Sequence, residues 1–136
     1  VHVILGLPKE TKKQMKKTVS WLSCQPIDGI KLQLLHILKG TDLADIYQKD
    51  PFHVFSMEEY IDLVIDCITL LPPRITIHRM TGDGPKNLLI APLWSGNKRL
   101  VLNQLHKRFK ERGAWQGQCY VSPLIPAALP FRHPQW

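Results

Sequence analysis

Apolar residues recur along the chain with two periods, one of two residues and one of about 3.6. Residues 1–5 form an apolar run rich in β-branched side chains, and the pattern predicts a buried strand. Residues 11–23 then carry an apolar stripe at helical spacing, made of Met15, Val19 and Leu22. Residues 30–38 alternate again and predict a second strand. A strand, a helix and a strand in succession predict a parallel βαβ unit with a right-handed crossover.

Two helix starts are marked by capping boxes, in which a hydroxyl residue and a Glu or Gln three positions later satisfy each other's free backbone amides. The pairs are Thr11 with Gln14 and Ser56 with Glu59. The same reasoning predicts helices over residues 41–47, 56–71 and 98–112, a strand over 75–80, and a strand or buried loop over 88–94. The resulting order of elements predicts an α/β chain.

Composition excludes several classes of protein. No apolar run approaches the roughly 20 residues that a membrane-spanning helix needs, so the chain is not expected to enter a membrane. The three cysteines are sparse, and no signal peptide precedes the first strand, which favours a cytoplasmic location. No CxxC pair, HxxxH pair, Walker loop or GxSxG motif is present, so no metal ligands are expected.

Basic residues outnumber acidic ones, with 18 Lys+Arg against 11 Asp+Glu. They gather on two predicted helices, in clusters made of Lys9, Lys12, Lys13, Lys16 and Lys17, and of Lys98, Arg99, Lys107, Arg108, Lys110 and Arg112. One interpretation is a solvated outer face on each helix. The other is a nucleic-acid footprint, because a basic surface attracts phosphates, although no aromatic residues interleave with either cluster.

Ligands of parallel α/β proteins bind at the carboxyl ends of the strands, and three segments of this chain occupy such ends. The first segment, residues 6–11, joins a small glycine to the start of a helix. It is either an anion site, because helix N-termini offer free backbone amides, or an ordinary turn between a strand and a helix. The second, residues 35–41, contains His36, which is either a structural histidine or a ligand contact. In the third, residues 78–85, Arg79 suits an anion clamp; a tight turn explains the glycines but leaves Arg79 and Asp83 unexplained.

An ordered set of motifs adds to these observations. Residues 3–11 (VILGLPKET) are similar to the GLPGET segment that ends the fifth barrel strand of many radical S-adenosylmethionine (SAM) enzymes. The motifs that follow are DGIKL at 28–32, HILKGT at 36–41, SMEEY at 56–60, IHRMTGDGP at 77–85, LLIAPLWS at 88–95 and Asn97-Lys98. Together they resemble the YhcC-like radical SAM proteins, relatives of the elongator catalytic subunit. The resemblance covers about residues 1–117.

The resemblance implies the last two units of a partial (β/α)6 TIM-like barrel at residues 1–50 and a radical SAM C-terminal α/β extension at 51–117. The family's cofactors are SAM and a [4Fe-4S] cluster held by a CxxxCxxC loop. That loop is absent here, so the resemblance implies an enzyme fragment, inactive alone, whose cluster ligands lie in a missing N-terminal half. The residues whose backbone would cradle SAM are Ile4, Gly6, Leu7, Leu35, His36 and Ile37. Those expected to face an unknown substrate are Lys39, Arg79, Thr81 and Asp83.

Two departures from the family pattern stand out. Lys9 replaces the second glycine of GLPGET, and residues 118–136 are proline-rich and expected to be disordered or loosely docked. The rival interpretation is a basic α/β module that binds RNA, such as tRNA, without its own catalysis. Two βα units cannot close a barrel, so we also expect an unpaired edge on the first strand, with marginal stability or association in solution.

Overall fold

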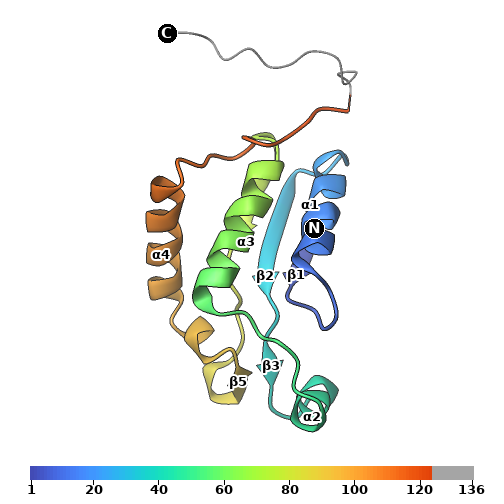
Figure 1. Ribbon diagram of the computed structural model, residues 1–136, viewed down its shortest axis with the longest axis vertical. Coiled ribbons are helices and arrows are strands. Elements are labelled where there is room, and N and C mark those ends of the chain that lie inside the picture. Colours follow the sequence, from blue (N-terminus) through green and yellow to red (C-terminus); the bar gives the residue numbers. More distant parts are fainter. Residues whose placement is uncertain (124–136) are drawn as a thin grey trace.

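A three-stranded parallel sheet forms the centre of the fold (Figure 1). The computed structural model describes residues 1–123. The strands are β1 (His2–Leu5), β2 (Gly29–Leu34) and β4 (Thr76–Arg79), in the order β1-β2-β4. The helix α1 (Lys12–Ser23) connects β1 to its parallel neighbour β2, which confirms the predicted βαβ unit.

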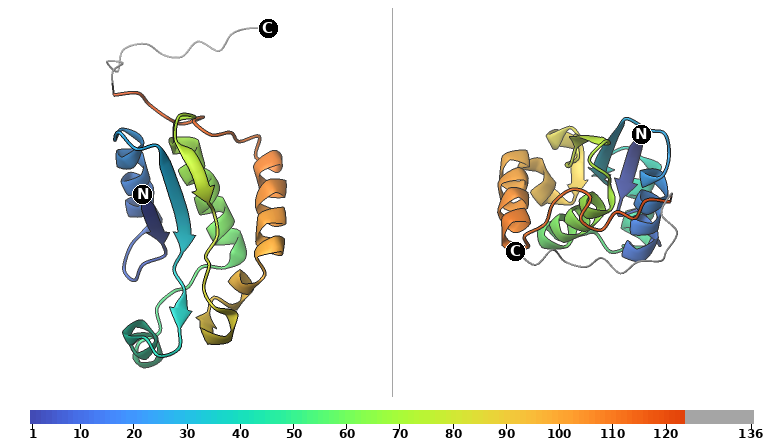
Figure 2. Two further views of the ribbon diagram at one scale, coloured as in Figure 1. Left: turned by 180° about the vertical axis from the view of Figure 1, so that it is seen from behind. Right: turned by 90° about the horizontal axis from the view of Figure 1, so that it is seen from above.

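Helices cover one face of this sheet. The helix α3 (Met57–Leu70) packs beside α1 against the strands, and α4 (Lys98–Glu111) packs on the outside of α3. The back view in Figure 2 shows the strands in front and the helices behind them. Alternate residues of β1 and β2 point into the helix layer and are buried: Val3, Leu5, Ile30, Leu32 and Leu34. The core therefore lies between the sheet and its helices.

The opposite face of the sheet is not covered by any helix within the described residues. The expectation of a strand buried on both sides at residues 1–5 is therefore wrong. His2 and Ile4 are exposed, Ile4 at 44%, whereas Val3 and Leu5 are buried. An apolar run is compatible with burial of either face of a strand. Which face is buried depends on the helices that pack against the sheet. In the order β1-β2-β4 the strand β1 also has no neighbour on its outer edge among residues 1–123.

The strand predicted over residues 30–38 is divided in two. β2 ends at Leu34, and β3 (Ile37–Leu38) pairs antiparallel with β5 (Leu89–Ala91) in a separate small sheet. Leu34 and Ile37 are both buried, although an odd spacing places residues on opposite faces of one continuous strand. The chain must turn between them, and it does so at Leu35 and His36.

The remaining boundaries follow the predicted caps. Both capping boxes form, and Thr41 caps the short helix α2 (Asp42–Lys49). Residues 86–96 contain the 3-10 turns η1 (Lys86–Leu88) and η2 (Leu93–Gly96) on either side of β5. Gly113 follows the end of α4 with φ of 56°. Glycine suits this position because few other residues adopt that conformation without strain. None of the helices described within residues 1–123 is long and apolar enough to cross a membrane.

The segment after α4 docks across the ends of α3 and β4. The side-chain amide of Gln116 donates to the carbonyls of Pro72 and Ile75, and the amide of Cys119 donates to Thr69 O at 2.8 Å. The proline-rich tail expected from residue 118 thus begins with a docked residue, and residues 124–136 lie outside the described residues.

Candidate functional site

The segments that follow β1 and β2 meet at one edge of the sheet. The amide of Leu35 donates to Leu5 O at 2.9 Å, so β2 stays beside β1 to its end. A Cβ placed on Gly6 would lie 3.8 Å from Leu35 Cβ and 3.2 Å from Phe55 Cε2. Gly6 also has φ of 97°. Glycine is therefore required here by the turn and by the Phe55 ring, in line with the ordinary-turn interpretation.

His36 joins this edge to the loop that follows β4. Its imidazole occupies the space that a Cβ on Gly82 would need, and Nδ1 lies 2.6 Å from the corresponding position on Gly84. The Nε2 atom is buried and has no hydrogen-bond partner among the described residues. Burial lowers the pKa of His36, and the ammonium of Lys98 lowers it further, while Asp83 opposes the shift. Burial and Lys98 therefore both favour the neutral form of the ring.

Asp83 is held by two cations. Its carboxylate accepts from Arg79 Nη1 at 3.1 Å and from the ammonium of Lys98 at the start of α4. The hydrogen bond from Lys98 is the main reason that the pKa of Asp83 lies below its usual range, with Arg79 contributing less. Thr81, between them in the same loop, is buried. The charged pair left unexplained by a tight turn is thus a clip that fixes this loop against α4.

Two aromatic residues fix segments at this end of the sheet: Tyr60 binds the loop after β4, and Trp94 binds the segment before α3. The Tyr60 hydroxyl donates to Met80 O at 2.9 Å, and Trp94 Nε1 donates to Phe55 O at 2.9 Å. The Tyr60 and Trp94 rings lie in contact, with centroids 5.7 Å apart. Burial raises the pKa of Tyr60 far above its usual value, so the hydroxyl stays a donor. Sequence analysis placed neither residue, nor Lys98, in the site; their only signal was their presence in the ordered motifs.

Not every predicted site residue reaches this edge in the same way. Ile4 and Leu7 expose 44% and 42% of their surface, so their side chains are available to a ligand. Ile37 is fully buried and pairs with Ala91 in β5, so its side chain is not available. The amide of Lys39 donates to Leu88 O, while its side chain is exposed.

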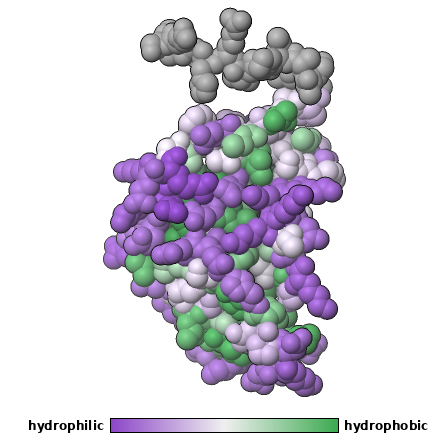
Figure 3. Space-filling model, in the orientation of Figure 1, coloured by the Kyte–Doolittle hydropathy of each residue, from purple (hydrophilic) through white to green (hydrophobic). Residues whose placement is uncertain are grey.

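Many of the basic residues of α1 and α4 pair with acidic residues of α3. Arg108 binds Asp62 at 2.9 Å, Arg112 binds Asp66 at 2.6 Å, and Lys16 binds Asp66 at 3.4 Å. Figure 3 shows the hydrophilic surface over these helices. This ion-pair belt binds the two outer helices to α3, so much of the basic charge has an internal function.

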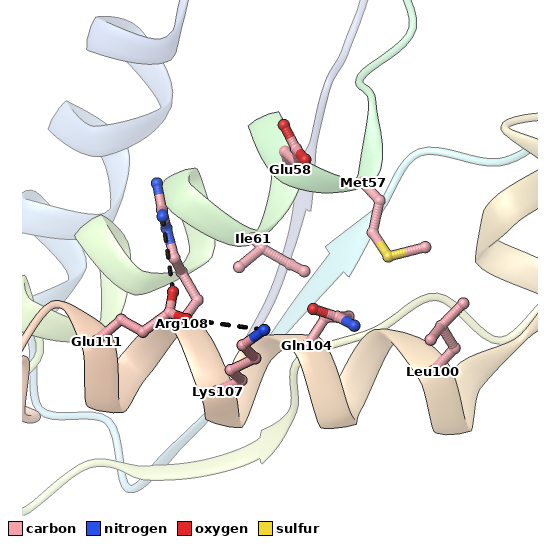
Figure 4. Close-up of a pocket in the computed structure, with 8 residues that line it drawn as sticks. All are labelled: Met57, Glu58, Ile61, Leu100, Gln104, Lys107, Arg108 and Glu111. Atoms are coloured by element: carbon pink, nitrogen blue, oxygen red, sulfur yellow. Dashed lines mark ion pairs between the residues drawn. The ribbon is translucent and has the colours of Figure 1, made fainter.

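A groove of about 570 Å³ lies between α3 and α4, away from the strand ends (Figure 4). Its apolar floor contains Met57, Ile61 and Leu100. The charged residues along it pair with one another, Glu111 with both Lys107 and Arg108. None of the residues predicted for the site lines this groove.

Comparison with known proteins places most of the chain in one family. The radical SAM C-terminal domain family matches residues 27–111. The chain belongs to this family. Its match crosses residue 50, and the segments before and after that residue contribute strands to one sheet.

Relatives of this radical SAM family member are much longer. The chain is 40% identical over 119 residues to YtqA of Bacillus subtilis, with 88% of the chain and 37% of YtqA covered. It is 30% identical to YhcC of Escherichia coli K12, with 92% of the chain and 40% of YhcC covered. An archaeal Elp3 structure from Methanocaldococcus infernus superposes with a TM-score of 0.69 at 18% identity, covering 85% of the chain and 27% of Elp3, which shows a shared fold.

The radical SAM family implies two cofactors, and this chain suits them differently. An iron–sulfur cluster requires several converging thiolates. Here Cys24 and Cys119 are exposed, Cys67 is buried in α3, and no three metal-binding side chains converge within residues 1–123. The described residues do not fit the cluster. The strand-end edge fits SAM better, because it offers two exposed apolar side chains, Ile4 and Leu7, whereas the orphaned Nε2 of His36 is buried against Gly82.

Lys9 is the residue that departs from the radical SAM motif GLPGET, and its backbone keeps the glycine conformation, with φ of 64°. Non-glycine residues pay about 1–2 kcal/mol to adopt this region.

We expect Lys9→Gly to raise the free energy of unfolding by about 0.5–1 kcal/mol, because the relief of strain exceeds the entropy that glycine adds to the unfolded chain. Urea unfolding measures the change. The control is Lys13→Gly in the first turn of α1, which should cost about 1 kcal/mol because glycine weakens a helix. Equal losses in both variants would contradict the expectation.

Proposed function

We propose that the chain supplies the SAM-cradling edge and the substrate side of a radical SAM enzyme, within a longer protein that carries the cluster ligands. The observation that supports this proposal most directly is the convergence of the segments after β1, β2 and β4 at one edge of a parallel sheet. Ligands of parallel α/β proteins bind at this edge. SAM, when bound beside a reduced cluster, supplies a radical that abstracts hydrogen from a substrate.

The residues of the chain have distinct parts in this proposal. Ile4 and Leu7 offer apolar contact to the adenine, and the backbone of Gly6 leaves room beside them. Leu35 and His36 form the adjoining wall, and Ile37 contributes only through its backbone. The substrate lies toward Lys39 and the loop of Thr81, whose position is fixed by the Arg79–Asp83 clip.

The uncovered face of the sheet suits the lumen of a partial barrel. Helices on one side and polar residues on the other are the arrangement of a barrel sector. The outer edge of β1 would then receive the preceding strand of the longer protein. We propose this completion on the basis of the family and the fold shared with Elp3.

The test begins with the DNA upstream of Val1, read in frame for CxxxCxxC. The longer protein, reconstituted without oxygen and reduced, is expected to cleave SAM to 5′-deoxyadenosine. Leu7→Asp should raise the KM for SAM at least tenfold, because a carboxylate replaces an apolar contact. Leu93→Asp, at a 74% exposed residue in η2, is the matched control. Absence of the cysteine motif, or equal KM values, would overturn the proposal.

We also propose RNA binding as a second, compatible function. Lys13, Lys17, Arg99 and Lys110 are exposed and have no ion pair within residues 1–123, so they remain free for phosphates.

If all four contact single-stranded RNA, the logarithm of the binding constant should fall against log[salt] with a slope of about −3. Fluorescence anisotropy of a labelled RNA at several salt concentrations measures this slope. Replacing all four residues by Gln should abolish it, whereas Lys49→Gln, at an exposed lysine that ends α2, is the control. Salt-independent binding, or none, would exclude the footprint.

A further inference from the structure

A shallow hollow of about 390 Å³ lies on the uncovered face of the sheet, the face turned to the viewer in the left view of Figure 2. It is lined by Val1, His2, Gly29, Lys31 and His78. These residues come from all three parallel strands or their starts. The lining contains one lysine and two imidazoles, and no carboxylate among the described residues.

The register of the sheet builds this hollow. His2 of β1 and Lys31 of β2 are Cα partners, so their side chains are neighbours on the same face. The pairing of β2 with β4 shifts between Ile30 and Lys31, where His78 is the extra residue. Such a bulge re-aims a side chain. The His78 imidazole accordingly lies over Gly29, in the space that a Cβ there would occupy.

The charge of Lys31 has no counterpart in this arrangement. Its register partner on β4 is Arg79, another cation, so the strand pairing supplies no counter-charge. Arg79 is neutralised by Asp83, but Lys31 has no ion pair within residues 1–123. A bound anion would compensate Lys31 and accept hydrogen bonds from the two imidazoles.

We propose that this hollow binds a small anion or an anionic group, a phosphate or a carboxylate, through Lys31, His2 and His78. The hollow lies at the amino ends of β1 and β2, away from the carboxyl-end edge assigned to SAM and the substrate, so anion binding here does not rest on the proposed function. A metal ion suits the hollow less, because it offers only two imidazole ligands and places an ammonium beside them.

The test uses the intact chain and the NMR signals of the His2 and His78 imidazoles. Inorganic phosphate is titrated in one series and acetate in another, both at constant ionic strength with sodium chloride. We expect saturable shifts of both signals with phosphate, acetate or both, and the tighter series identifies the chemistry. Lys31→Gln should weaken binding at least fivefold. Lys49→Gln, at an exposed lysine that ends α2, should leave it unchanged.

The backbone nitrogen of Val1 also lines the hollow and donates to Gly29 O at 3.0 Å. In the longer protein proposed above this nitrogen is an uncharged amide, so the titration is repeated on chain acetylated at Val1. Binding should persist, and its loss would overturn the assignment to Lys31 and the imidazoles. Absence of saturable shifts, or equal affinity in Lys31→Gln, would also overturn it. Because phosphate titration needs neither SAM nor a cluster, its failure is distinct from a failure of SAM cleavage.

Discussion

Replacing Gly82 by alanine is expected to displace the His36 imidazole and to lower the free energy of unfolding by about 1–3 kcal/mol. The ring fills the space that the new methyl group needs, and Gly84 confines it on the Nδ1 side. The clip that joins Asp83 to Arg79 and Lys98 keeps the loop from moving away. Urea unfolding gives the energy, and the shift of the His36 NMR signal reports the displacement.

The matched control is Gly96→Ala, whose new Cβ would meet Leu89 Cδ2 at an ordinary 3.9 Å and should cost far less. A double variant, Gly82→Ala with His36→Ala, isolates the contact. It should recover part of the loss, since residues in contact are not additive. An additive result, or an unmoved His36 signal in Gly82→Ala, would show that the ring and the loop are not packed as described.

Lowering the pH from 7 to 2 is expected to destabilise the chain by about 1 kcal/mol through the ion-pair belt, because its pairs are partly exposed to solvent. The hydrogen bond from Arg108 is the main cause that lowers the pKa of Asp62 in the folded chain. A carboxyl whose pKa is lowered by folding stabilises the fold above its unfolded pKa, here 3.8. That stabilisation is lost as the pH falls below this value.

Asp62→Asn should flatten the fall in stability between pH 5 and 2 by roughly half, because it removes the carboxylate shared by Arg108 and Arg112. Urea unfolding at a series of pH values measures the curve. Glu58→Gln, exposed on the same helix, should leave the curve nearly unchanged. Identical curves for Asp62→Asn and the unmodified chain would assign the acid sensitivity to other carboxyl groups, such as Asp83 and Glu59, whose pKa values are also lowered.

Much of the candidate site was predictable, because the principle that selects it depends on strand order alone. Parallel strands bring their carboxyl ends to one edge, so Gly6, Leu35 and the loop after Arg79 were expected to meet there. The Arg79–Asp83 pair was also recognisable, since its two charges lie four residues apart in one turn. Lys98 was not, because it comes from a helix 15 residues beyond Asp83. The sequence pattern groups Lys98 with the basic residues of its helix and does not predict its ion pair with Asp83.

By itself, the sequence determined the elements whose energetics are local. The capping boxes at Thr11 and Ser56, the turn at Gly6 and the stop at Gly113 involve groups within a few residues of one another. Only the tertiary structure decided which groups meet over long distances. It divided the strand at Leu35 and His36, because Ile37 is buried in a second sheet with β5. It also left one face of β1 uncovered and directed Arg108 and Arg112 to the carboxylates of α3. These outcomes depend on packing and charge pairing between distant segments, which a local pattern does not encode.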